Sequence, residues 1–163
     1  MFHIRKTTTS DVPIILFFIH ELAKYEKLAH EVVATEQDLE KTLFGNTPQA
    51  EVLLAIADDT PVGFALFFPN YSTFLGRGGI HLEDLFVLKE HRGKGYGKAL
   101  LKEIANIALS RNAGRLEWNV LDWNTPAIHF YRHIGATPME EWTTFRLTGE
   151  SLRKFASSAH ETN

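Results

Sequence analysis

Residues 91–101 read His91-Arg92-Gly93-Lys94-Gly95-Tyr96-Gly97-Lys98-Ala99-Leu100-Leu101. An apolar segment precedes this stretch and a helical pattern follows it, which predicts a strand, a glycine-rich turn and a helix. Glycines at alternate positions permit a sharp turn and let successive backbone N–H groups approach a ligand. The helix start adds its own unpaired amides and the positive end of its dipole. The stretch therefore predicts a loop that binds a phosphate-bearing cofactor.

The spacing of the glycines decides between cofactors. No segment fits the Walker A pattern G-x-x-x-x-G-K-[ST]. A dinucleotide fingerprint would need a glycine at position 98, where the chain has Lys98, although Glu117 lies near the distance of a ribose-binding acid. Arg92, Gly95 and Gly97 match the spacing Arg-x-x-Gly-x-Gly. This spacing resembles the acetyl-CoA loop of the GCN5-related N-acetyltransferase (GNAT) superfamily. A dinucleotide loop and a tight turn without a ligand remain the weaker alternatives.

Length and composition suit one globular domain. The chain has 163 residues, and we expect a single domain over residues 1–163. Its 17 basic and 20 acidic residues show no charge footprint for nucleic acid. Cysteine is absent, which excludes disulfides, thiolate metal ligands and a cysteine-linked acyl intermediate. Residues 1–6 lack the apolar core of a signal peptide, and the longest apolar run, Ile14 to Ile19, is too short for a membrane span. These features predict a soluble cytoplasmic protein.

The periodicity of apolar residues predicts a mixed α/β fold with six to seven strands in one sheet, flanked by helices. The expected strands are Phe2–Thr7, Val52–Ala57, Val62–Phe68, Ile80–Leu88, Arg115–Leu121 and Trp142–Leu147. The expected helices are one capped by Ser10 and ending near Tyr25, one capped by Thr35, and three over Gly95–Arg111, Thr125–Ile134 and Ser151–Ala156. The turn Asp58-Asp59-Thr60-Pro61 indicates a hairpin.

Three further segments extend the resemblance over almost the whole chain. These are Glu21–Glu26, Leu82-Glu83-Asp84-Leu85-Phe86-Val87, and the W-N-x-x-A-x-x-F-Y pattern from Trp123 to Tyr131. Together with the glycine loop they resemble the spermidine/spermine N-acetyltransferase family, whose members also acetylate diamines or the lysine analogue thialysine. The likeness runs from about Ile4 to Phe155. The chain departs from the family in its short turn at Asp58–Pro61 and in lacking a glycine before Trp142.

The resemblance implies a GNAT fold, acetyl-CoA as co-substrate, a small amine as acceptor and a homodimer. It also implies that Asn124 contacts the cofactor arm and that Tyr131 lies near the sulfur as general acid. The backbone at Phe86 and Val87 is expected to pair with the pantetheine amides, as an added strand would. The pyrophosphate is expected on the loop formed by Arg92, Gly93, Lys94, Gly95, Tyr96, Gly97 and Lys98.

Glu83 and Asp84 are the acidic pair of the strand that precedes the loop. An ideal pleat sends neighbouring side chains to opposite faces, although a β-bulge would alter this. We assign Glu83 as the base that takes the amine proton through water, with His81 as second candidate, and Asp84 as the group that holds the cationic acceptor. The alternative is a solvated or ion-paired strand edge.

Four residues elsewhere suit the rim of a site for a polycation, since carboxylates and aromatic faces both attract cations. They are Glu21, Tyr25, Glu26 and Trp142. For Glu21 and Glu26 an ordinary charged helix face explains the pattern equally well. His129 and His133 have a spacing that can bind metal, but no nearby carboxylate completes a zinc motif, so no metal site is predicted.

Three functions remain open at this point. The favoured one is transfer of an acetyl group from acetyl-CoA to a polyamine, diamine or lysine analogue. Because the chain has no cysteine, direct attack of the amine in a ternary complex is the natural mechanism. The second is acetylation of a protein or peptide, which needs an open groove. The third is a non-catalytic module that senses acetyl-CoA.

Overall fold

The computed structural model describes residues 1–158 and divides the chain into two compact units, Met1–Leu121 and a second that begins at Asp122. The first unit contains β1 (Phe2–Lys6), η1 (Thr9–Asp11), α1 (Val12–Tyr25), η2 (Ala29–Glu31), α2 (Glu36–Phe44), β2 (Glu51–Ala57), β3 (Thr60–Ser72), β4 (Arg77–Val87), η3 (Lys89–His91), α3 (Tyr96–Ser110) and β5 (Leu116–Trp118). The second unit contains α4 (Thr125–His133) and α5 (Gly149–Ser157).

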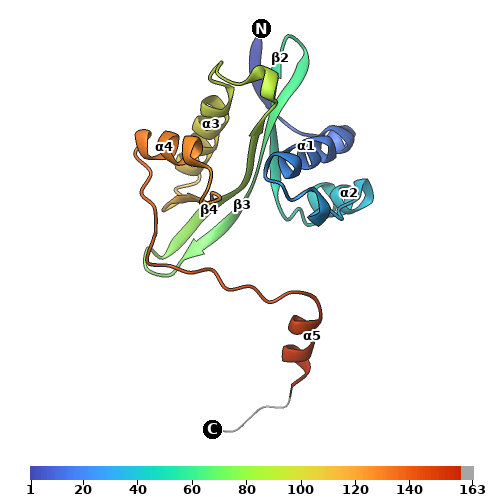
Figure 1. Cartoon of the computed structure of the whole chain (residues 1–163), viewed down its shortest axis with the longest axis vertical. Coiled ribbons are helices and arrows are strands. Elements are labelled where there is room, and N and C mark those ends of the chain that lie inside the picture. The colour runs from blue at the N-terminus through green and yellow to red at the C-terminus, as the bar shows by residue number, and fades with distance from the viewer. Residues whose placement is uncertain (159–163) are drawn as a thin grey trace. The chain divides into compact units, whose positions relative to one another are not determined.

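One five-stranded sheet in the order β1-β2-β3-β4-β5 organises the first unit. The first four strands are antiparallel, and β5 joins β4 in parallel after the crossover helix α3. In Figure 1, α1 and α2 lie on one side of the sheet and α3 lies on the other. The sheet is therefore covered on both faces, which explains why β2 is buried along almost its whole length.

The core between α1, α2 and the sheet depends on aromatic packing. Phe18 of α1 and Phe64 of β3 are both fully buried, and their rings stack with centroids 5.4 Å apart. Aliphatic side chains of β2 surround them and alternate along that strand, namely Val52, Leu54 and Ile56. Leu39 and Leu43, four residues apart on one face of α2, close the cluster.

The expected number of strands was too high. Only residues 116–118 of the expected strand Arg115–Leu121 pair with β4, and Trp142–Leu147 forms no strand in the described part of the chain. The apolar side chains of that last segment, at Trp142, Phe145 and Leu147, are exposed. An alternating pattern makes a strand only where a partner satisfies its backbone hydrogen bonds, and this segment has no partner strand within residues 1–158.

The helix ends follow local sequence signals with one exception. Thr35 caps α2 as predicted, since its hydroxyl accepts a hydrogen bond from the amide of Asp38. Ser10 does not cap α1, because a short turn of 3₁₀-helix precedes that helix and Asp11 occupies the cap position. The Asp11 carboxylate accepts two hydrogen bonds of 2.8 Å from Arg5 of β1, so a contact with the neighbouring strand determines where α1 begins.

We expect Phe18→Ala to lower the free energy of unfolding by about 3–5 kcal/mol, because the substitution leaves a cavity beside Phe64. Urea denaturation would measure the loss. Phe17→Ala is the matched control, since the neighbouring ring is 43% exposed and its removal should cost much less. Equal losses in the two variants would show that the Phe18–Phe64 contact is not central to the core.

Candidate active site

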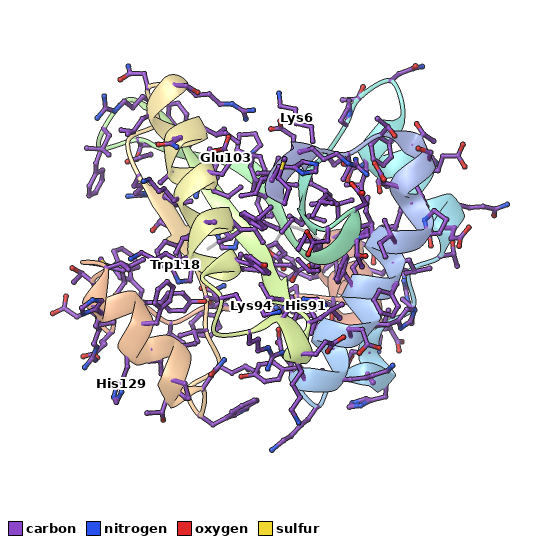
Figure 2. All side chains as sticks on the ribbon, turned by 90° about the horizontal axis from the view of Figure 1, so that it is seen from above. Lys6, His91, Lys94, Glu103, Trp118 and His129 are labelled. Carbon is purple, nitrogen blue, oxygen red and sulfur yellow. The ribbon has the colours of Figure 1, made fainter. Side chains whose placement is uncertain are left out.

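The glycine loop between η3 and α3 has the conformation that its sequence predicts. Gly93 has φ +77° and Gly95, the N-cap of α3, has φ +83°. A Cβ at either position would meet no atom within 4 Å, so backbone conformation and not crowding requires glycine there. Figure 2 labels His91 and Lys94 on this segment. Open space beside the unpaired first amides of α3 is what a bound pyrophosphate needs, so the loop fits the cofactor.

An aromatic contact and a closely approaching glycine place the start of α3 against the sheet. The ring of Tyr96 stacks on Phe2 of β1 with centroids 4.3 Å apart and planes inclined by 6°. Gly97 faces Val87, where a Cβ would make an ordinary contact of 3.7 Å. The side chain of Tyr96 thus packs on β1, and what this residue offers a ligand is its backbone amide.

Beside the loop, β4 continues past the end of its partner β5. The parallel ladder runs from Ile80 to Leu82 on β4, opposite residues 116–118, whereas β4 itself extends to Val87. Among the described residues no strand pairs with residues 83–87 on the β5 side. The side chains of Phe86 and Val87 are buried, so this edge presents backbone groups with which the amides of an extended ligand can pair.

A β-bulge lies at the centre of β4. Leu66 of β3 pairs with Asp84, but Phe67 pairs with Leu82, which leaves Glu83 as the extra residue. A bulge rotates the strand locally and re-aims its side chains. Glu83 and Asp84 therefore do not follow the ideal pleat, and the structure has the β-bulge that the sequence left open as the alternative.

The bulge gathers His81, Glu83 and Asp84 on one face. His81 and Asp84 pair with Phe68 and Leu66, two residues that share a face of β3. The Glu83 side chain is 55% exposed, and its Oε2 lies 3.3 Å from Nε2 of His81. The two candidate bases are therefore direct neighbours.

A third carboxyl group comes from the residue that follows α1. Burial, and after it the negative charges of Glu83 and Glu26, raise the pKa of Asp84 to about 7. The pKa of Glu26 is also raised, first by burial and then by the charge of Glu83. Carboxyl groups that disfavour one another's ionised form attract a cation. Glu26, Glu83 and Asp84, here called the acidic cluster, therefore suit a positively charged acceptor.

A pocket of about 430 Å³ lies next to α1 and the end of β4. It contains two of the predicted rim residues, Glu21 and Tyr25, and Glu21 forms an ion pair with Lys24. The pocket is lined by Phe17, Glu21, Lys24, Tyr25, Phe86, Leu88, Lys89, Glu90 and Arg92. We call this space the α1 pocket.

The side chain of Arg92 belongs to the α1 pocket, which sequence reasoning did not anticipate. Its Nε donates a hydrogen bond of 2.9 Å to the carbonyl oxygen of Val87. Its guanidinium carbon lies 4.7 Å from the ring centre of Tyr25 and 5.2 Å from that of Phe86. The motif placed Arg92 in the cofactor loop through its backbone, and no local signal connects it to Tyr25.

Three predicted site residues belong to the second unit. Asn124 is the N-cap of α4, and its carbonyl oxygen accepts from the amide of Ile128. Tyr131 lies on the same helix, where its ring contacts that of Phe130. Trp142 follows in the extended segment and is largely exposed. Their roles stay predictions.

Residues 1–158 contain neither a metal-binding group nor a membrane-spanning helix. No group of three or more His, Asp or Glu side chains in this part of the chain is arranged so that it could hold a metal ion. None of its helices combines the length and apolar character of a membrane span.

Comparisons with known proteins agree with this geometry. The sequence profile of the acetyltransferase (GNAT) family matches residues 18–136. A thialysine N-epsilon-acetyltransferase of Bos taurus is 39% identical over 94% of this chain and 96% of that protein. An L-ornithine N5-acetyltransferase of Arabidopsis thaliana is 35% identical over 92% of this chain and 86% of that protein.

The solved structures confirm the fold. An integron cassette protein from the mobile metagenome of Vibrio cholerae superimposes with a TM-score of 0.80 at 31% identity, covering 96% of this chain and 98% of that one. The predicted resemblance to the diamine and thialysine acetyltransferases is thus confirmed, with five strands in place of six to seven. The chain belongs to the acetyltransferase (GNAT) family and is an acetyl-CoA-dependent N-acetyltransferase that acts on amines.

Proposed function

We propose that this enzyme acetylates a primary amine of a small cationic acceptor, either a polyamine, a diamine or a lysine-like diamino acid. The acidic cluster carries the proposal, because it brings three carboxyl groups together on the face of β4 beside α1. Relatives named for thialysine and ornithine support an acceptor of this size. The family match continues across residue 121, which supports one catalytic domain over the whole chain.

Acetyl-CoA supplies an activated acetyl thioester when it is bound. The backbone amides of residues 92–98 would hold its pyrophosphate, and the backbone of β4 at Phe86 and Val87 would pair with the amides of its pantetheine arm. Asn124 contacts the same arm, as the family resemblance implies. Positioning two reactants in one site can lower a barrier by about 7–11 kcal/mol, so this scaffold supplies a large share of the catalysis.

The acceptor amine arrives protonated, since its pKa in water is about 10. Asp84 and Glu26 stabilise the cation before reaction. Glu83 removes the proton through a water molecule, and the Nε2 of His81, 3.3 Å away, is the competing acceptor for it. Direct attack in the ternary complex would join the neutral amine nitrogen to the acetyl carbonyl carbon and break the thioester C–S bond, and the Tyr131 hydroxyl would protonate the leaving sulfur.

The extended segment after α4 supports a homodimer. Trp142, Phe145 and Leu147 expose large apolar side chains, which a second copy of the chain would cover. Trp142 stays in this proposal as part of the aromatic rim of the acceptor site.

The deciding experiment measures release of the CoA thiol from acetyl-CoA with spermidine, spermine, putrescine, thialysine, ornithine, lysine and a short lysine peptide. We expect saturable release with at least one small amine. Release with the peptide alone would favour a protein acceptor. Binding of acetyl-CoA without release from any acceptor would favour a sensor, and both results would contradict the proposal.

Tyr131→Phe should lower turnover by about 10²–10⁴-fold, the usual contribution of general acid–base catalysis. Acetyl-CoA binding, measured by calorimetry, should stay close to that of the wild type because the ring is retained. Tyr71→Phe removes the same hydroxyl from an exposed position on β3 and serves as the control. Unchanged turnover in the Tyr131 variant would remove this residue from the mechanism.

Asp84 should make the stability of the fold depend on pH. Its pKa is about 7 in the folded protein, above its value of 3.8 in a model compound, so the folded state binds more protons between these values. Stability therefore falls as pH rises from about 4 to about 7, by at most about 1.4 kcal/mol per pH unit.

Asp84→Asn removes this penalty. Urea denaturation gives the free energy of unfolding of both proteins. The value for the variant minus that for the wild type should be larger at about pH 8 than at about pH 5. Asp59→Asn, the same change in the exposed hairpin turn, should show no such gain. A difference between wild type and Asp84→Asn that does not vary with pH would mean that Asp84 has an ordinary pKa.

A further inference from the structure

We infer that Arg92 is a positioning residue that links the cofactor loop to the acceptor site. Its backbone lies in the Arg-x-x-Gly-x-Gly segment, whereas its side chain lines the α1 pocket. Binding of acetyl-CoA at the loop would thereby fix Tyr25 in the wall of the α1 pocket, next in sequence to Glu26 of the acidic cluster. This inference rests on the proposed function, which places the pyrophosphate on the loop and the amine beside α1.

The contacts of Arg92 hold its guanidinium group from three directions. The hydrogen bond from Nε to the Val87 carbonyl fixes the inner edge of the group. The rings of Tyr25 and Phe86 lie 4.7 Å and 5.2 Å from its central carbon, and the two rings are 6.4 Å apart. Only a planar group with a donor at Nε satisfies all three contacts, and a lysine ammonium lacks both features.

Tyr25 connects these contacts to the acidic cluster. It is the last residue of α1, and the next residue is Glu26, whose charge acts on Asp84. The ring of Tyr25 is 39% exposed, so packing in the core does not hold it as it holds Phe18. The position of the Arg92 side chain therefore affects Tyr25, which forms part of the pocket wall, and through it the neighbouring residue Glu26.

The loop that carries Arg92 is the part of the site that a cofactor would stabilise. Gly93 and Gly95 adopt positive φ angles, and glycine loses the most conformational freedom when such a segment becomes fixed. A pyrophosphate on the loop amides restricts the segment and with it the backbone of Arg92. The effect is reciprocal, so cofactor and amine must each tighten the binding of the other by the same factor.

Hydrogen exchange tests the inference without any acceptor. In the wild type, saturating CoA should slow exchange of the peptide spanning residues 17–26 about fivefold or more, the lower end of typical coupling between sites. Arg92→Lys keeps the charge, so it should bind CoA within about threefold of the wild type in calorimetry, yet show no slowing. Lys102→Gln, which removes a charge from the exposed side of α3, should behave as the wild type does.

Steady-state kinetics give the second measurement. With the amine that the wild type acetylates fastest, Arg92→Lys should raise the KM for the amine about fivefold or more while kcat at saturation stays within about twofold. Full slowing of exchange in Arg92→Lys would overturn the inference. So would a loss of CoA affinity of about tenfold or more with an unchanged amine KM, because Arg92 would then be a ligand of the pyrophosphate. A wild type that binds no CoA would overturn the proposed function and this inference with it.

Discussion

The site depends on the two places where the regular pairing of β4 with its neighbouring strands is interrupted. Its ladder with β5 ends at Leu82, and its ladder with β3 is shifted by a bulge at Glu83. A regular strand would pair on both edges and would carry no backbone groups for a ligand. The two irregularities together free one edge of β4 for a cofactor arm and place two carboxyl groups on one face. They lie immediately before the loop on which we propose that the phosphates bind, so one continuous segment provides both halves of the proposed site.

Burial of Asp84 has a cost that indicates its role. A carboxyl group in a mostly buried position would ordinarily be paired with a cation, as Asp11 is paired with Arg5. That pairing lowers the pKa of Asp11 to about 2, whereas Asp84 has other carboxyl groups as neighbours and a pKa of about 7. The contrast agrees with the role proposed for Asp84 in holding a cationic acceptor. A cationic acceptor would supply the charge that Asp84 lacks, which ties substrate choice to the electrostatics of the fold.

The α1 pocket shows how one residue can serve two parts of a site. Arg92 belongs to the glycine loop by sequence and to the pocket by its side chain. Cation–π contacts with Tyr25 and Phe86 and a hydrogen bond to the backbone are individually modest. Their combination sets the direction of the guanidinium group. In this arrangement α1, β4 and the glycine loop all contribute to the contacts of the Arg92 guanidinium group.

By itself, the amino-acid sequence determined the order of the main helices and strands from β1 to α4, the glycine loop, the helix that follows it and the family, because these depend on local periodicity, turn chemistry and motif spacing. It also identified Glu83 and Asp84 as the acidic pair and Thr35 as a helix cap. Only the tertiary structure decided that both acids share a face and that Arg92 turns toward Tyr25. It also decided that Asp11 begins α1 and that Trp142–Leu147 forms no strand within the described residues. Each of these outcomes depends on pairing or packing between residues far apart in the chain, and a pattern read along the chain does not contain that information.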